Sequence, residues 1–288
     1  MFSTILSIIN NGEDKNFDDT CRRLEKCINS GKNFIDTLRQ IEIIPESIPH
    51  DSTAEKLFAK ASDLALSRAF NELGLKSVVV RERSDSADIL AESRLFGYSL
   101  VSDAKVFRLS RTAKNQKDFK VSALSGWRKD NDFAVLCAPY FQYPARNSQI
   151  YSQAIMNNVC LLSWEHLIFF IENGIKESAA VNLSALWNFC DNFSKQVLVS
   201  DMKKNFLPDL NRFLARLVNI DSNNLYSSFR EQKQRIITRS SEEKSYWLDR
   251  IQQIRQYSRE QAVNELITSL KIHEKLNHID AYIRSLSS

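Results

Sequence analysis

The chain has few of the residues that build phosphate-binding turns, with only six glycines and five prolines among 288 residues. It contains no G-x-G-x-x-G stretch and no P-loop, the two glycine-rich patterns that hold nucleotide phosphates. The G-x-S-x-G pattern of serine hydrolases and the H-E-x-x-H pattern of zinc peptidases are also missing. These absences argue against a nucleotide-dependent enzyme and against the common hydrolases.

Cysteines are also few, and none of them forms a C-x-x-C pair. An odd count without paired spacing argues against a disulfide framework or a zinc site. Two cysteines lie in apolar runs, where we expect small buried side chains. The five are Cys21, Cys27, Cys137, Cys160 and Cys190.

No run of about 18 apolar residues occurs, which excludes a membrane-spanning helix. The apolar start of the chain lacks a basic leader and a small-residue cleavage site, so we expect a helix there and not a signal peptide. Together with reduced thiols, this predicts a cytoplasmic protein. The formal net charge of +4 permits a polyanionic partner without requiring one.

Helical spacing dominates both ends of the chain. We expect helices over residues 1–48, with polar breaks at 10–12 and 29–31. Ser52 followed by Glu55 is the signature of a capping box, and the apolar residues of 57–73 keep helical spacing up to Gly74, which suits a C-terminal cap. After Pro208 the chain has neither glycine nor proline, so its last 80 residues are expected to be helical.

Between these ends, short apolar or alternating runs predict strands at residues 77–81, 98–107, 133–138 and 159–163, followed by a helix at 164–173. The segment 176–200 has no clear pattern. The predicted fold class is α/β (α+β), with a central mixed β-sheet flanked by helices and a largely helical C-terminal region. We expect an N-terminal helical region at 1–50, a core at 51–175 and a helical region at 176–288 packed on that core, forming one domain overall.

Asp103 and Lys105 are the first candidates for chemistry. They are two residues apart in a predicted strand, so their side chains share a face with Val101 and Phe107. An aspartate and a lysine among apolar neighbours are costly unless they are paired or bind a metal. The triplet alone favours a salt bridge at the sheet rim over a metal-binding carboxylate beside a lysine that activates water, because such triplets are common.

Three upstream acids are candidates to join Asp103. Asp85 lies between serines and is typical of a turn. Asp88 directly precedes Ile89 and Leu90, which favours a position at the start of a strand facing Asp103; a loop acid here could also approach Asp103 if the strands on either side pair as a hairpin. Glu55 is either a cap residue or an active-site acid that projects toward the sheet edge. Two carboxylates with water suit Mg²⁺, and metal-assisted phosphodiester hydrolysis requires such a cluster.

Residues 108–120 form the densest basic segment, and they directly follow the predicted Asp-Lys strand. The segment mixes Arg and Lys with Ser, Thr, Asn and Gln, a combination that suits phosphate contacts and the reading of base edges. A solvated charged loop is the alternative, which the position beside a possible metal site makes less favourable. The candidate DNA-binding residues are Arg111, Lys114, Asn115, Lys117, Asp118 and Lys120.

The run from Val101 to Val121 resembles the HindIII family of type II restriction endonucleases almost residue for residue. Further similar segments lie at 52–58, 138–144, 163–167 and 259–262, so the resemblance covers nearly the whole chain. The family belongs to the PD-(D/E)xK nucleases, in which an acid after the first core strand pairs with an acid-x-Lys on the second. The matching residues here are Asp88, Asp103 and Lys105, while Ala87 replaces the proline of the motif.

The resemblance implies Mg²⁺-dependent hydrolysis of double-stranded DNA at the palindrome AAGCTT, cut between the two adenines to leave 5′ overhangs with 5′-phosphates. It implies a homodimer in which each protomer reads one half-site. Asn115 is expected to contact adenine and Lys117 guanine, while Asp118 orients one of these side chains or accepts from cytosine. The implied catalytic residues are Asp88, Asp103, Lys105 and, on the preceding helix, Glu55; the implied metal ligands are Asp88, Asp103 and Ala104.

Two alternatives stay open at this point. The first is a repair or recombination nuclease of the same superfamily with little sequence specificity, which the sequence dependence of its cuts would distinguish. The second is a catalytically inactive DNA-binding relative, against which the presence of Asp88, Asp103 and Lys105 argues.

Overall fold

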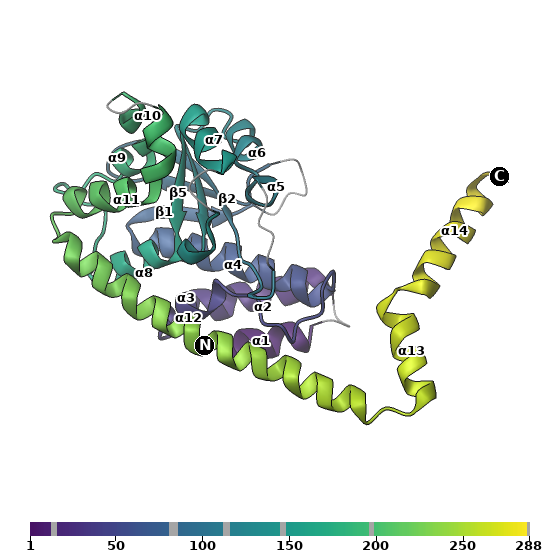
Figure 1. The fold of residues 1–288 in the computed structure, drawn as a ribbon. Helices are drawn as coiled ribbons and strands as arrows, with labels where there is room; N and C mark the ends of the chain where they lie inside the picture. The colour runs from purple at the N-terminus through teal and green to yellow at the C-terminus, as the bar shows by residue number, and fades with distance from the viewer. Residues whose placement is uncertain (13–15, 81–85, 112–115, 145–147, 196–198, 287–288) are drawn as a thin grey trace. The chain divides into compact units, whose positions relative to one another are not determined.

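The computed structural model describes residues 1–12, 16–80, 86–111, 116–144, 148–195 and 199–286, and Figure 1 shows the fold. Five strands form one sheet in the order β1-β2-β3-β4-β5. The first three are antiparallel neighbours, and the β3–β4 and β4–β5 pairs are parallel, which confirms the predicted mixed sheet. The strands are β1 Leu75–Val79, β2 Ile89–Ser93, β3 Ser99–Ala104, β4 Phe133–Ala138 and β5 Val159–Ser163.

Residues 77–81 and 98–107 do not pair directly as a hairpin, because β2 lies between β1 and β3 and pairs with both. Its side chains alternate between buried and exposed along Ile89–Ser93, which a strand covered on one face requires. The predicted bounds of β4 and β5 are confirmed, and Cys137 and Cys160 are buried there as expected.

Four helices precede the sheet: α1 Phe2–Asn10, α2 Phe17–Ser30, α3 Phe34–Ile41 and α4 Thr53–Glu72. The Ser52 hydroxyl accepts a hydrogen bond from the Glu55 backbone N–H at 3.1 Å, so the predicted cap forms. The Glu55 carboxylate in turn accepts a hydrogen bond from the Asp51 N–H at 2.8 Å. Gly74 follows the helix at φ +92°, a conformation that favours glycine. Helix α4 packs on β1, β2 and β3 and is buried along most of its length.

The helices after β3 confirm the predicted helical C-terminal region. Pro208 lies inside one of them instead of before it. No helix among the described residues is both long and apolar enough to cross a membrane. The remaining elements are α5 Gln116–Phe119, α6 Val121–Trp127, the 3₁₀ helix η1 Tyr140–Gln142, α7 Gln149–Asn157, α8 Trp164–Glu172, α9 Ser184–Trp187, α10 Phe189–Ser194, α11 Val199–Leu217, α12 Ser222–Arg255, α13 Arg259–Ser269 and α14 Ile272–Leu286.

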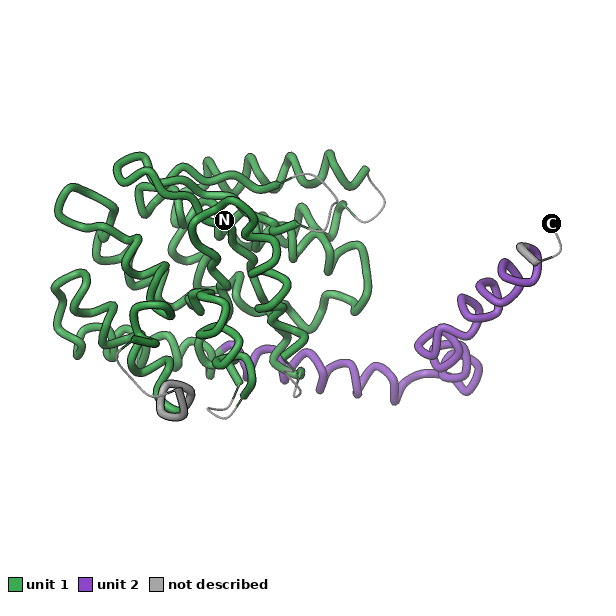
Figure 2. The backbone as a smooth tube through the Cα atoms, turned by 90° about the horizontal axis from the view of Figure 1, so that it is seen from above, with its two compact units in different colours: residues 1–238 green, residues 239–288 purple. Residues whose placement is uncertain are grey.

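The chain divides into two compact units, residues 1–238 and 239–288, shown in separate colours in Figure 2. The first unit contains the sheet and its covering helices. The second contains the end of α12 together with α13 and α14. The expected boundaries at residues 50 and 175 fall inside the first unit, so the C-terminal helical region is shared between the two.

A pair of buried carboxyl groups lies in the core of the first unit. The side chains of Glu42 and Glu165 are 2% and 0% exposed, and Glu42 Oε2 and Glu165 Oε1 are buried without a hydrogen-bond partner among the described residues. Two neighbouring carboxyl groups in such a site favour a state in which they share one proton. Glu165 also accepts a hydrogen bond from the Tyr140 N–H at 2.8 Å. Burial raises the pKa of Glu165 from 4.5 to about 7, and burial and the neighbouring Glu165 together raise the pKa of Glu42.

The Glu165→Gln variant should therefore lose part of the pH dependence of folding. An acid whose folded-state pKa is raised gives stability that is present below its unfolded pKa and is lost as pH rises through the folded one. For Glu165 that window runs from about 4.5 to about 7. Glutamine keeps an acceptor for Tyr140 and a donor for Glu42, so at pH 8 the variant should be more stable than the wild type by on the order of 1–3 kcal/mol.

Urea denaturation at pH 5 and at pH 8 measures this difference. The exposed Glu92, changed to glutamine, is a matched control that should leave the slope unchanged. A Glu165→Gln variant whose stability runs parallel to the wild type between the two pH values would contradict the shared-proton pair.

Candidate active site

Strand register brings Asp88 and Asp103 together. Strands β2 and β3 are antiparallel with Ile89 opposite Ser102, so one further step places Asp88 opposite Asp103. Side chains directly opposite each other in an antiparallel pair lie on the same face with Cβ atoms roughly 5 Å apart. The backbone of Asp88 is fixed from the other side, because its carbonyl accepts from the Val80 N–H at 2.8 Å.

Lys105 is held at the end of β3 by its backbone. Its N–H donates to the Cys137 carbonyl at 2.7 Å, which continues the parallel ladder with β4 by one residue. Its carbonyl accepts from the Trp164 indole at 3.0 Å. The Lys105 ammonium donates to Asp103 Oδ2, so the predicted contact between these two side chains is present.

Asp103 is almost fully buried, with 2% of its surface exposed. Burial raises the pKa of its carboxyl group, the Lys105 ammonium opposes that rise, and the negative charge of Asp88 adds to it. Lys120 also acts on this pKa, which shows that this residue, at the end of the basic segment, comes near the cluster. A carboxylate in this setting is stabilised by additional positive charge.

Helix α4 contributes a third acid that the sequence analysis missed. Asp63 is 8% exposed, and burial raises the pKa of its carboxyl group well above its ordinary value. The negative charges of Asp88 and Asp103 raise it further, while Lys60 and Lys105 lower it. These interactions place Asp63 in the same cluster as the strand residues. A lone aspartate in the apolar stretch of 61–70 was the signal in the sequence that could have identified it.

The cluster has the donor chemistry that Mg²⁺ requires. No hydrogen bond or ion pair joins the side chain of Asp63 or Asp88 to another residue that the structure describes. Carboxylates that are buried or partly buried without a donor are costly, and a divalent cation removes that cost. Carboxylate oxygens are hard ligands, and Ala104 at the end of β3 offers its backbone carbonyl. The residues therefore fit a hard cation that keeps part of its water shell.

Glu55 lies in different surroundings from the three aspartates. Its carboxylate accepts from the Arg108 guanidinium at 2.8 Å. Together with His50 and Asp51 it forms a group whose ligand atoms lie within 4.8 Å of one another, and His50 and Asp51 are exposed. The ligand atoms of the three aspartates do not all lie within this span of one another. Mg²⁺ takes only one or two carboxylates and fills its other positions with water, so it does not require all three.

Among the predicted DNA-binding residues, the structure describes Arg111, Lys117, Asp118 and Lys120. Arg111 donates to the Asp118 carboxylate, and its guanidinium lies 5.6 Å from the centre of the Phe107 ring. Lys117 is exposed on α5, and Lys120 lies 5.9 Å from the Trp127 ring. The predictions for Lys114, Asn115 and Asp85 lie outside the described residues.

The segment after β3 is anchored by residues that the sequence analysis did not identify. Ile43 forms a bridge with Phe107, and the Glu46 carboxylate accepts from the Ser110 N–H at 3.0 Å and from its hydroxyl at 2.9 Å. Phe119 on α5 is buried and stacks on Tyr143 with ring centres 5.6 Å apart. These contacts fix both sides of the basic segment beside Asp103 and Lys105.

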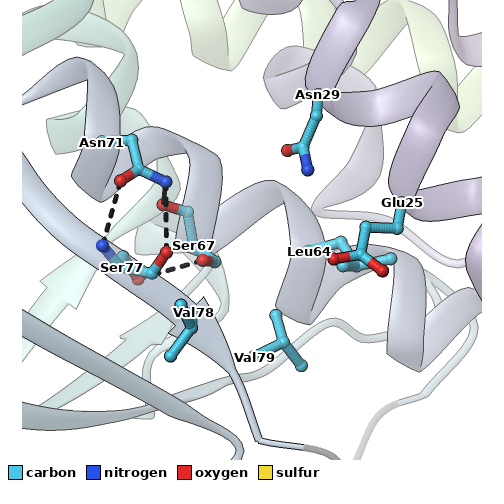
Figure 3. Close-up of a pocket in the computed structure, with 8 residues that line it drawn as sticks. All are labelled: Glu25, Asn29, Leu64, Ser67, Asn71, Ser77, Val78 and Val79. Carbon is cyan, nitrogen blue, oxygen red and sulfur yellow. Dashed lines mark hydrogen bonds between the residues drawn. The ribbon is translucent and has the colours of Figure 1, made fainter.

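A pocket of about 360 Å³ lies between α2, α4 and β1, as Figure 3 shows. The Asn71 amide bridges α4 and the edge strand: its oxygen accepts from the Ser77 N–H at 2.9 Å, and its nitrogen donates to the Ser67 carbonyl at 3.1 Å. The hydroxyls of Ser67 and Ser77 are 3.0 Å apart. These bonds occupy a backbone group of an edge strand that would otherwise be open to pairing with another chain, so we assign the pocket a structural role.

Comparison with known proteins finds similarity to one family over nearly the whole chain. A family model described as HindIII restriction endonuclease matches residues 7–283. The chain belongs to the HindIII restriction endonuclease family. A relative from Haemophilus influenzae, the type II restriction enzyme HindIII, is 42% identical over 286 residues, which cover 99% of this chain and 95% of the relative.

Membership in the HindIII family confirms the resemblance drawn from residues 101–121 and the fold class. It also makes the chain a type II restriction endonuclease, a site-specific deoxyribonuclease. Of the two alternatives, the nuclease with little sequence specificity is disfavoured by this membership.

Proposed function

We propose that the protein is a cytoplasmic prokaryotic enzyme that hydrolyses double-stranded DNA at AAGCTT, cutting between the two adenines with Mg²⁺ as its cofactor. The observation that carries the proposal is the juxtaposition of Asp88 and Asp103 across the β2–β3 register, with Lys105 bonded to Asp103. Family membership supports the specificity.

Each residue of the cluster has a distinct task in this proposal. Asp88, Asp103 and the Ala104 carbonyl hold the cation, and Asp63 adds negative charge beside them. A bound Mg²⁺ supplies neutralisation of the scissile phosphate and lowers the pKa of a coordinated water. The backbone of Lys105 is fixed by hydrogen bonds on both sides. Its side chain therefore has a defined position from which it orients the attacking water. Lys105 also takes part in the deprotonation of this water. In-line displacement then leaves a 3′-hydroxyl and a 5′-phosphate.

Recognition is assigned to the segment that follows β3. Asn115 pairs with adenine and Lys117 with guanine, while Asp118 orients Arg111, to which it is bonded. Arg111, Lys114 and Lys120 contact phosphates, which position the protein without reading sequence. Each protomer of a two-fold symmetric homodimer reads one half of the palindrome.

Digestion of DNA of known sequence, in Mg²⁺ and in EDTA, with every end mapped, tests the proposal. We expect Mg²⁺-dependent cuts at AAGCTT only. Discrete cuts at another sequence would overturn the specificity and leave the enzyme class intact. Specific binding without cleavage would identify a catalytically inactive relative.

Lys117→Ala should weaken discrimination at one base pair of the site. The lysine is exposed on α5, whereas its neighbour Phe119 is buried, so truncation should leave the fold intact. Loss of a contact to a base edge costs roughly 1–3 kcal/mol of discrimination. Cleavage rates on AAGCTT and on duplexes with one altered base pair measure this effect.

The exposed Lys176, outside the basic segment, provides a matched control when it is changed to alanine. An equal loss of cleavage on every duplex would instead make Lys117 a phosphate contact, with a weaker dependence of binding on salt.

A further inference from the structure

The second unit lacks a hydrophobic core of its own. In residues 239–284, the part of this unit whose side chains the structure describes, no hydrophobic side chain is buried. Helix α13 has 11 residues and α14 has 15. Helices of this length are marginal in water on their own, and most helical stability in proteins comes from packing of an apolar face. The unit therefore needs a surface that covers it.

Apolar residues follow helical spacing on each of the three helices in this unit. They are three and four residues apart at Val263 and Leu266 on α13 and at its C-cap Leu270, and four and three apart on α14 at Ile272, Leu276 and Ile279. This spacing is typical of helices that pack against other helices. We call the following set the C-terminal apolar face, in which each residue is at least 37% exposed: Tyr246, Leu248, Ile251, Ile254, Val263, Leu266, Leu270, Ile272, Leu276 and Ile279.

The charge of the unit argues against DNA or an anionic membrane as its partner. Residues 239–288 contain eight lysines and arginines and seven aspartates and glutamates, so the two signs nearly cancel. Binding to a polyanion requires an excess of positive charge. A segment of mixed and balanced charge is suited to a protein surface, including a copy of itself.

The first unit offers little apolar surface in return. Among the described residues, its exposed large hydrophobic side chains occur singly or in pairs, the pairs being the cross-strand partners Val78 and Leu90 and the consecutive Leu95 and Phe96. The single ones are Phe141, Met156, Tyr226 and Ile237. A second copy of the C-terminal apolar face, by contrast, supplies the same density of apolar residues. The ten residues, each roughly half exposed, present on the order of 1,000 Å², comparable with the ~800 Å² per partner of a standard interface.

We propose that the C-terminal apolar face is the surface on which a second copy of this chain docks, in an isologous two-fold contact between the α12–α14 segments. The inference rests on the proposed function for its purpose, because a palindrome cut in both strands requires two active sites in one symmetric particle. It identifies the element that joins them.

The test measures the mass of the full chain by light scattering from 1 to 50 µM, for the wild type and for Leu266→Glu/Leu276→Glu. The wild type should have twice the monomer mass of 33.2 kDa. The double variant should dissociate with a dissociation constant raised at least 100-fold, because two charges would be buried in the contact. The control is Leu95→Glu/Met156→Glu, which places the same charges at sites that are 59% and 81% exposed in the first unit and should stay dimeric.

Hydrogen exchange of residues 239–284 at several protein concentrations keeps the test decisive if the variant helices fray. Protection that rises with concentration supports docking of a second copy. Protection that is independent of concentration would show that the chain's own first unit covers the face, and it would overturn the proposal, as would a monomeric wild type or a double variant that stays dimeric.

Cleavage assays run in parallel separate this inference from the proposed function. A monomeric wild type that cuts AAGCTT would overturn the docking surface alone. A dimer that behaves as expected but does not cut AAGCTT would overturn the specificity alone. If both hold, the double variant should accumulate nicked plasmid, because monomers cut the two strands in separate encounters.

Discussion

Asp103→Asn should reduce DNA cleavage by about 10³-fold or more while binding to the recognition site stays within a few-fold of the wild type. Asparagine keeps the shape of the side chain and an oxygen that accepts from Lys105, so the end of β3 should hold its position. It removes the negative charge that, together with Asp88, would hold the cation. Cleavage in Mg²⁺, and binding in EDTA, give the two readouts.

Asp132→Asn is the matched control. Asp132 is exposed and accepts from the Ser99 N–H at 2.8 Å, at the other end of the same strand, so its carboxylate has a structural partner and no part in the cluster. It should cut at the wild-type rate. An Asp103→Asn variant that retains full activity would remove Asp103 from the metal site, and one that loses both binding and cleavage would show a folding defect instead.

The parts of the fold that could be predicted are those whose signal is local. Strands β4 and β5 are continuous apolar runs that are buried on both faces, and their bounds were read directly from the sequence. Strand β2 could be predicted only at its start, from Asp88 before Ile89 and Leu90, because Leu90 is exposed on a short segment whose only signal is alternation. A direct hairpin between β1 and β3 therefore stayed open. The correct register still brings Asp88 opposite Asp103, through β2 itself.

The site was predictable as far as it depends on two strands. Asp103 and Lys105 are two residues apart on one strand, so their contact follows from the alternation of side chains. Asp63 could not be placed in the same way, because its proximity to them depends on how α4 lies across the sheet. The lone aspartate in the stretch of 61–70 indicates a buried acid, but the helical period does not show which strand residues that acid approaches. Packing between helix and sheet supplies that information.

Two acids of helix α4, Asp63 and Glu55, are candidates for a role at the metal site, and variants of each distinguish them. Asp63→Asn should lower cleavage at 1 mM Mg²⁺ by at least about tenfold, and a higher Mg²⁺ concentration should restore part of it, because the variant loses one negative charge that attracts the cation. The same variant should be more stable than the wild type in EDTA at pH 8, by on the order of 1 kcal/mol. Burial raises the pKa of Asp63, so its ionised form destabilises the fold as pH increases.

Glu55→Gln is the comparison that decides between the two helix acids. Glu55 is paired with Arg108 at 2.8 Å, so we expect cleavage to stay within a few-fold of the wild type at every Mg²⁺ concentration, with a small loss of stability. Asp63→Asn is thus expected to lose activity and gain stability, whereas Glu55→Gln is expected to keep activity and lose a little stability. A shifted Mg²⁺ requirement in Glu55→Gln, with none in Asp63→Asn, would assign the helix acid of the metal site to Glu55. Stability gained together with activity lost marks an acid kept for function, because a neutral side chain would fold better at that position.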